Sequence, residues 1–166
     1  MLSPELEAAM NRQIAAELYS SNLYLAMAAY CEAQNLPGFA HWFRLQSEEE
    51  RSHALKFFTH VVDRGGRATV GEVAAPPADF GSALGAFERA LVQEREVTGM
   101  IDDLFATAVE QRDYASQVFL QWFVEEQVEE EKQASDAVQS LAAIGGAPAS
   151  LLLLDRELGS RSPDAG

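Results

Sequence analysis

The chain has 166 residues, of which 48% are hydrophobic, which is enough for one domain with a sizeable core but too little for two comfortable ones. Its 26 Asp and Glu residues against 12 Lys and Arg give a formal net charge of -14, which argues against nucleic acid or an anionic membrane as partner and favours cations as ligands. The single cysteine, Cys31, excludes an intrachain disulfide framework and an all-cysteine metal centre, so we expect a reducing, cytoplasmic compartment.

The first residues read as the start of a helix and not as a secretory signal, because no basic segment is followed by an apolar one. Ser3 and Pro4 supply a capping hydroxyl and a first-turn proline, and Glu5 and Glu7 suit the helix dipole. We therefore expect a first helix that reaches about Gln34. No apolar run in the chain approaches the roughly 20 residues of a spanning helix, so we do not expect a membrane protein.

A second helix is expected over about residues 39–64, where the pair Gly65-Gly66 ends it. The next segment, about residues 67–81, contains Pro76-Pro77 and shows no helical periodicity. Short turns join antiparallel neighbours, whereas a segment of roughly 15 residues can return along the full length of a helix pair. This segment is therefore predicted to be a crossover.

Two long helices and one short helix follow the crossover. The third is expected over about residues 82–111, and Arg112-Asp113 separates it from a fourth that reaches Ile144. After a Gly-Gly-Ala-Pro stop, a short fifth helix is expected over about residues 149–158.

These elements predict an all-α fold, a four-helix bundle with a long crossover between its second and third helices and a short fifth helix at the C-terminus. We expect a single domain over residues 1–158. A Gly/Ser/Pro/Asp-rich segment, residues 159–166, is predicted to be a flexible tail.

Each long helix interrupts its own apolar stripe with side chains that can bind metal. Glu50 and His53 lie in the middle of the second helix, three residues apart, so one carboxylate and one imidazole can reach the same cation. A core histidine beside a solvated glutamate explains this pair equally well when it is taken alone. The corresponding interruptions in the other helices are Glu17, Glu94, Gln127 and Glu130.

These positions lie near the middle of each helix, so antiparallel packing would bring them to one level. A carboxylate buried alone costs several kcal/mol, so a cluster of them is tolerable mainly around bound cations. Several carboxylates with one imidazole suit iron or manganese, and zinc could also occupy such a site. We expect Glu50 to bridge two cations, one bound by Glu17 and His53 and the other by Glu94 and Glu130.

Other polar side chains near this level have more than one reading. Tyr24 on the first helix is either a core residue or a source of a hydrogen bond or an electron. The acidic run at residues 125–131 reads mostly as a solvated face. Within it Glu126 and Glu129, with Glu49 on the second helix, flank the core positions and could hold a third cation.

The chain resembles the ferritin family, specifically the haem-free bacterial ferritins. Residues 39–54, closing at Arg64-Gly65-Gly66, are similar to the family's second helix, and residues 123–127 resemble its fourth-helix motif. The resemblance extends from about Leu6 to Leu158 and includes the crossover and the fifth helix. It implies a shell of twenty-four identical subunits that oxidises Fe(II) with dioxygen or peroxide at an intrasubunit di-iron ferroxidase centre and stores Fe(III) mineral inside.

The resemblance also implies which side chains hold iron, with one ion at Glu17, Glu50 and His53 and a second at Glu50, Glu94 and Glu130. It places Gln127 beside the second iron and matches Tyr24 to the family's site tyrosine. The third iron site described for the bacterial branch corresponds to Glu49, Glu126, Glu129 and Glu130.

Related families fit this chain less well. Bacterioferritins carry a second Glu-x-x-His where this chain has Gln127 and Glu130, and a haem-binding methionine where it has Arg51, so no haem is expected. Rubrerythrins need paired cysteines, and dodecameric Dps proteins lack the fifth helix. Animal ferritins line their three-fold channels with acids where this chain has Gln117 and Leu120.

The remaining alternatives are a di-iron oxidase or oxygenase that acts on an organic substrate, and a rubrerythrin-like peroxidase. A third is a bundle whose buried acids are merely paired.

Overall fold

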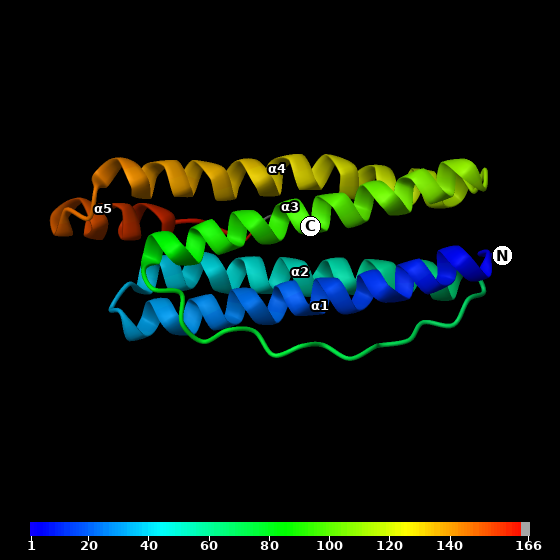
Figure 1. The fold of residues 1–166 in the computed structure, drawn as a ribbon, viewed down its shortest axis with the longest axis horizontal. Helices are drawn as coiled ribbons and strands as arrows, with labels where there is room; N and C mark the ends of the chain where they lie inside the picture. The colour runs from blue at the N-terminus through cyan, green and yellow to red at the C-terminus, as the bar shows by residue number, and fades with distance from the viewer. Residues whose placement is uncertain (164–166) are drawn as a thin grey trace.

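The computed structural model describes residues 1–163, which fold into five helices joined by turns and one long crossover. The four long helices lie side by side in an elongated bundle with the short helix at one end (Figure 1). No helix in this part of the chain is both long and apolar enough to cross a membrane. The predicted fold class is confirmed by the helices α1 (Pro4–Ala33), α2 (Pro37–Asp63), α3 (Ala83–Glu110), α4 (Tyr114–Ile144) and α5 (Pro148–Leu158).

Helix ends follow local sequence signals. Ser3, Ser82 and Asp113 cap α1, α3 and α4, each accepting a hydrogen bond from the backbone N–H three residues later at 2.9 to 3.1 Å. Gly145 ends α4 with φ of 56°, a left-handed conformation that glycine adopts at little cost. Because these signals are local, the boundaries expected from the sequence agree with the observed ones to within a few residues.

The crossover links two antiparallel helix pairs, α1 with α2 and α3 with α4. It runs back along the bundle beside α1, so that α3 begins at the end where α2 begins (Figure 1). Asn11 on α1 holds its first residues, because its side chain donates to the carbonyl of Arg67 at 2.9 Å and accepts from the N–H of Thr69 at 2.8 Å. The predicted crossover is therefore present and fastened to the bundle.

A polar layer divides the apolar core into two clusters. One cluster gathers around Phe39, Phe43 and Phe87, and the other around Phe57 and Phe123. Burying polar side chains between two apolar clusters costs free energy unless they find partners. The buried polar residues include Gln13, Glu17, Gln46, Glu50, His53, Glu94, Gln127 and Glu130.

The short helix α5 packs on the first turn of α2. The buried Asp155 carboxylate accepts a hydrogen bond from the Phe39 N–H at 2.8 Å, which satisfies one of the unpaired donors of a helix N-terminus. Gly38 permits this approach, because a Cβ at that position would lie 1.7 Å from the Asp155 carbonyl oxygen. The contact orients α5 and the chain that follows it.

We expect Gly38→Ala to lower the free energy of unfolding by about 1–3 kcal/mol, because the added methyl group must push α5 away and break the Phe39–Asp155 hydrogen bond. Gly99→Ala is the matched control, since a Cβ at this helical glycine meets nothing within 4 Å. The control should gain up to about 1 kcal/mol from helix propensity. Urea unfolding measures both variants, and equal stability would contradict the proposed contact.

Candidate metal centre

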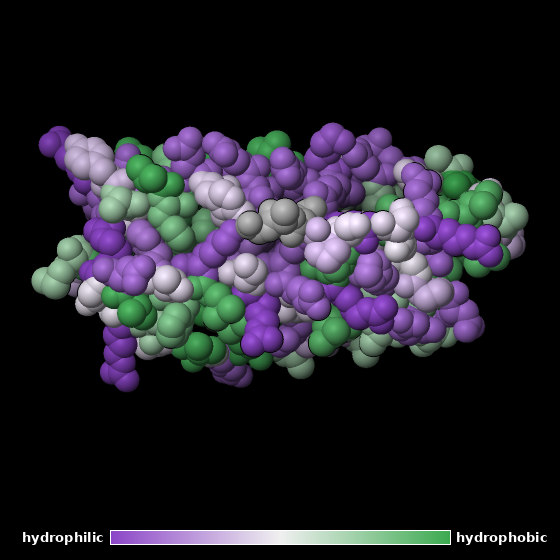
Figure 2. Space-filling model, turned by 180° about the vertical axis from the view of Figure 1, so that it is seen from behind, coloured by the Kyte–Doolittle hydropathy of each residue, from purple (hydrophilic) through white to green (hydrophobic). Residues whose placement is uncertain are grey.

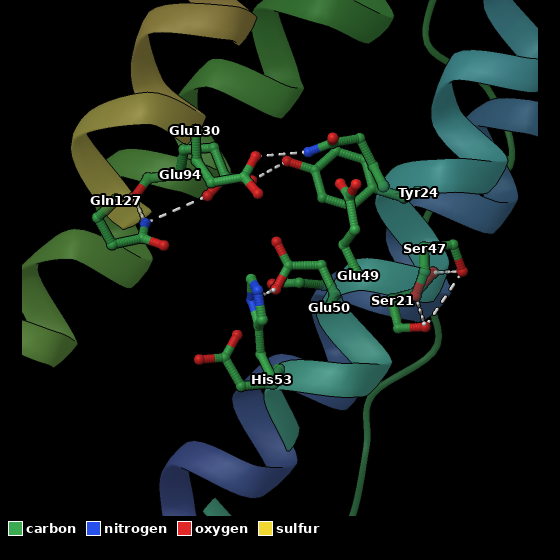
Figure 3. A network of polar contacts seen from close by, with 12 residues as sticks. Ser21, Tyr24, Ser47, Glu49, Glu50, His53, Glu94, Gln127 and Glu130 are labelled. Atoms are coloured by element: carbon green, nitrogen blue, oxygen red, sulfur yellow. Dashed lines mark hydrogen bonds and ion pairs between the residues drawn. The ribbon is translucent and has the colours of Figure 1, made fainter. Parts of the chain in front are cut away.

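The centre of the polar layer brings together Glu17 from α1 with Glu50 and His53 from α2. All three side chains are buried, and one ligand atom from each lies within 4.8 Å of the others. His53 Nδ1 is 3.2 Å from Glu50 Oε2, as the three-residue spacing on one helix face predicts. Figure 3 shows the two α2 side chains pointing toward the space between the helices.

Glu94 from α3 and Glu130 from α4 complete the layer, each held by neutral donors. The Tyr24 hydroxyl donates to Glu94 Oε1, and Gln127 Nε2 donates to Glu94 Oε2 at 3.2 Å (Figure 3). Gln46 Nε2 donates to Glu130 Oε2 at 2.7 Å. Such hydrogen bonds fix the orientation of potential metal ligands without neutralising their charge.

Four ionised carboxylates in this layer would carry more negative charge than their protein partners can balance. Among residues 1–163, no arginine or lysine forms an ion pair with any of the four carboxyl groups, and His53 lies beside Glu50. Two buried oxygens, Glu17 Oε2 and Glu50 Oε1, lack any hydrogen-bond partner in this part of the chain. Unsatisfied buried acceptors are rare in folded proteins and call for a partner, such as an ion or an ordered water. Four carboxylates and one imidazole fit iron, manganese or zinc.

Without a cation, the buried carboxyl groups of the layer remain protonated to a higher pH than ordinary glutamates. Burial raises the pKa of Glu17 to about 7, although its contact with Glu50 and the hydrogen bond that it accepts from Gln13 oppose the shift. Burial also raises the pKa values of Glu50 and Glu130 well above the usual range, and repulsion from Glu94 adds to the effect. A cation that enters at neutral pH must therefore displace protons from these carboxyl groups.

His53 is ready to bind metal without losing a proton. Burial, with the nearby positive charge of Lys56, lowers the pKa of His53 to about 4, so the imidazole is neutral at physiological pH. Its ring lies edge-on to Trp122 with centroids 5.4 Å apart, and Lys56 Nζ lies 3.3 Å from the Trp122 ring centroid. The aromatic contact holds the ring in place.

A cleft of about 380 Å³ between α2 and α4 leads from the surface to His53. Glu126 lies in it, and ligand atoms of His53, Glu126 and Glu130 fall within 4.8 Å of one another. Glu129 lines the cleft but is exposed, and Glu49 pairs with Arg161 from the C-terminal segment. Of the predicted third-cation residues, the structure thus groups Glu126 and Glu130 with His53, whereas Glu49 and Glu129 line the same cleft outside that group.

Three contributors to the layer were absent from the predicted site. Gln13 donates to Glu17 at 2.9 Å, and Gln46 holds Glu130. Both glutamines stand four residues before a predicted ligand on the same stripe, so the spacing contained a signal for them. Arg161 carried no such signal, because residues 159–166 were expected to form a flexible tail. Residues 164–166 lie outside the described part of the chain.

Comparison with known proteins agrees with this architecture. The family model for a ferritin-like domain matches residues 7–144. The chain is 42% identical to the bacterial non-heme ferritin of Staphylococcus aureus over 164 residues, or 99% of each chain. It is 41% identical to that of Staphylococcus epidermidis over 162 residues, or 98% of each.

Solved structures show the same likeness. An engineered closed form of the Archaeoglobus fulgidus ferritin superposes with a TM-score of 0.96 at 45% identity, covering 99% of this chain and 100% of that one. The open pore ferritin of the same archaeon also gives a TM-score of 0.96 at 45% identity, covering 98% and 100%. This chain therefore belongs to the ferritin family, and its likeness to the haem-free bacterial ferritins extends over nearly the full length of both.

Proposed function

We propose that this protein stores and detoxifies iron by oxidising Fe(II) within the polar layer and depositing Fe(III) inside a cage built from copies of itself. One observation carries the proposal, namely the two buried carboxylate oxygens, Glu17 Oε2 and Glu50 Oε1, that have no partner among the described residues. Both belong to the group that includes the neutral His53 imidazole. A bound cation supplies the missing partner for each oxygen.

Fe(II) is the substrate, and the layer offers it two adjoining positions. Glu17, Glu50 and His53 hold one ion, whereas Glu50, Glu94 and Glu130 hold the second, so that Glu50 is shared. Binding releases protons from the carboxyl groups whose pKa values burial has raised, with Glu17 at about 7 as the clearest case. Iron uptake therefore weakens as the pH falls through this value.

The side chains around the layer favour oxidation of bound iron. Two adjacent Fe(II) ions each give one electron to a shared oxidant, dioxygen or peroxide, and anionic carboxylates stabilise the more highly charged Fe(III) product. Tyr24 and Gln127 hold Glu94 in orientation, and Gln46 does the same for Glu130. Burial of Tyr24 and the surrounding negative charge raise its pKa well above 10.0, so it remains a neutral donor to Glu94.

We further propose a third iron position in the cleft, at Glu49, Glu126, Glu129 and Glu130. Its support is the grouping of Glu126 and Glu130 with His53, together with the open volume that joins them to the surface. Assembly into a shell of twenty-four subunits is proposed from the full-length family likeness. The buried free thiol of Cys31 is compatible with the proposed cytoplasmic location.

Iron loading in air tests the function as a whole. Fe(II) is added in large excess over subunits, and the products are separated by gel filtration with light scattering and iron analysis. We expect Fe(III) to co-elute with a protein assembly far larger than a dimer. Elution as a monomer or dimer, with iron precipitating as fast as in a protein-free control, would contradict iron storage and favour a soluble di-iron oxidase.

A further inference from the structure

The chain beyond α5 returns to α2 through Arg161. Both oxygens of the Glu49 carboxylate accept hydrogen bonds from Arg161 Nη2 at 2.9 Å. Arg161 Nη1 donates to Gln46 Oε1 at 2.5 Å, and the guanidinium carbon lies 5.3 Å from the Trp42 ring centroid. The Arg161 side chain is only 14% exposed. This part of the chain end is therefore held by several contacts at once.

These contacts reach the proposed third iron position from two sides. Glu49 is engaged directly, because both of its oxygens accept hydrogen bonds from Arg161 Nη2. Glu130 is engaged through Gln46, which accepts from Arg161 and donates to Glu130 at 2.7 Å. Each carboxylate oxygen keeps a second lone pair, but a metal ion that approaches Glu49 meets the positive charge of the guanidinium at short range.

The same segment also lies at the mouth of the cleft. Pro163 is one of its lining residues, together with Glu49, Glu126 and Glu129. Figure 2 shows the molecule from the side opposite to Figure 1, where hydrophilic side chains predominate along the upper part of the face. Gly159 packs so closely on Gly38 that the chain leaves α5 from a defined position, two residues before Arg161. The docking of α5 on α2 thus positions Arg161 at this site.

We propose that Arg161 is a built-in counter-cation of the third iron position, which balances Glu49 until Fe(II) arrives and is displaced when it binds. The inference rests on the proposed third site. Two cations competing for one carboxylate repel each other across a few ångströms, so the guanidinium lowers the affinity of the third position. Binding of the third ion is thereby coupled to release of the segment around Arg161 from α2.

Anaerobic titration of the assembled protein with Fe(II), followed by calorimetry, tests the proposal. Arg161→Gln removes the charge and should tighten binding of the third equivalent about tenfold or more, with a much smaller effect on the first two equivalents. Arg161→Lys keeps the charge but loses the planar fork, and should give an intermediate affinity. Thermal melting of each variant without iron confirms that the fold is retained.

Two further variants make the test specific. Arg156→Gln carries the same charge change on the exposed face of α5 and should leave the third equivalent unaltered. In a Glu49→Gln background, Arg161→Gln should change the third-equivalent affinity less, because the carboxylate for which Arg161 and iron compete is gone. Equal third-equivalent affinity in Arg161→Gln and Arg156→Gln would overturn the role of Arg161 while leaving the di-iron proposal intact. Failure of the first two equivalents to bind the unmodified protein would instead refute the proposed function.

Discussion

Replacing Glu50 with alanine is expected to slow Fe(II) oxidation in air by roughly a hundredfold or more. Glu50 is the carboxylate that both proposed iron positions share, and its Oε1 has no hydrogen-bond partner among the described residues. Its loss therefore removes a ligand from each ion at once. Stopped-flow absorbance of Fe(III) at a fixed ratio of iron to subunits measures the initial rate.

Two variants accompany this experiment. Glu50→Gln preserves the shape of the side chain but not its charge, and should show a similar loss of rate. Glu125→Ala removes an exposed glutamate on α4 and should oxidise iron at the unmodified rate. If Glu50→Ala also kept the unmodified rate, oxidation would have to occur outside the polar layer, and the proposed centre would be wrong.

In the metal-free protein, Glu17→Gln is expected to be more stable than the unmodified chain at pH 8, by about 3 kcal/mol. Burial raises the pKa of Glu17 from 4.5 to about 7. The folded chain therefore retains a proton that the unfolded chain has lost, and the associated stability is present below pH 4.5 and disappears as the pH rises through about 7. The difference between the two proteins should vanish near pH 4.5 and grow to its full value above pH 7.

Urea unfolding at several pH values measures this difference, with Glu88→Gln as the control because Glu88 is exposed on α3. Adding Zn(II), which does not change oxidation state, should reverse the order at pH 8. The unmodified protein then gains the binding free energy that its complete ligand set provides, and Glu17→Gln gains less. If the difference in unfolding free energy between the two proteins did not depend on pH, the pKa of Glu17 would not be raised by folding.

Much of the fold was predictable because its determinants are local. Helix periodicity and the caps at Ser3, Ser82 and Asp113 depend on residues within a few positions of each other, so the helix ends could be read from the sequence. The length of the segment after Gly66 predicted the crossover. Mid-helix placement of Glu17, Glu50 and Glu94 predicted their common level, because antiparallel helices of similar length align their midpoints.

The fine structure of the site depended on contacts between residues far apart in the chain. The sequence by itself determined the helices, their order and which polar side chains break each apolar stripe. Only the tertiary structure decided that Tyr24 and Gln127 hold Glu94, and that two carboxylate oxygens remain without a partner among residues 1–163. It also decided that Arg161 reaches Glu49, because that contact requires α5 to dock on Gly38 before the chain can turn back along α2.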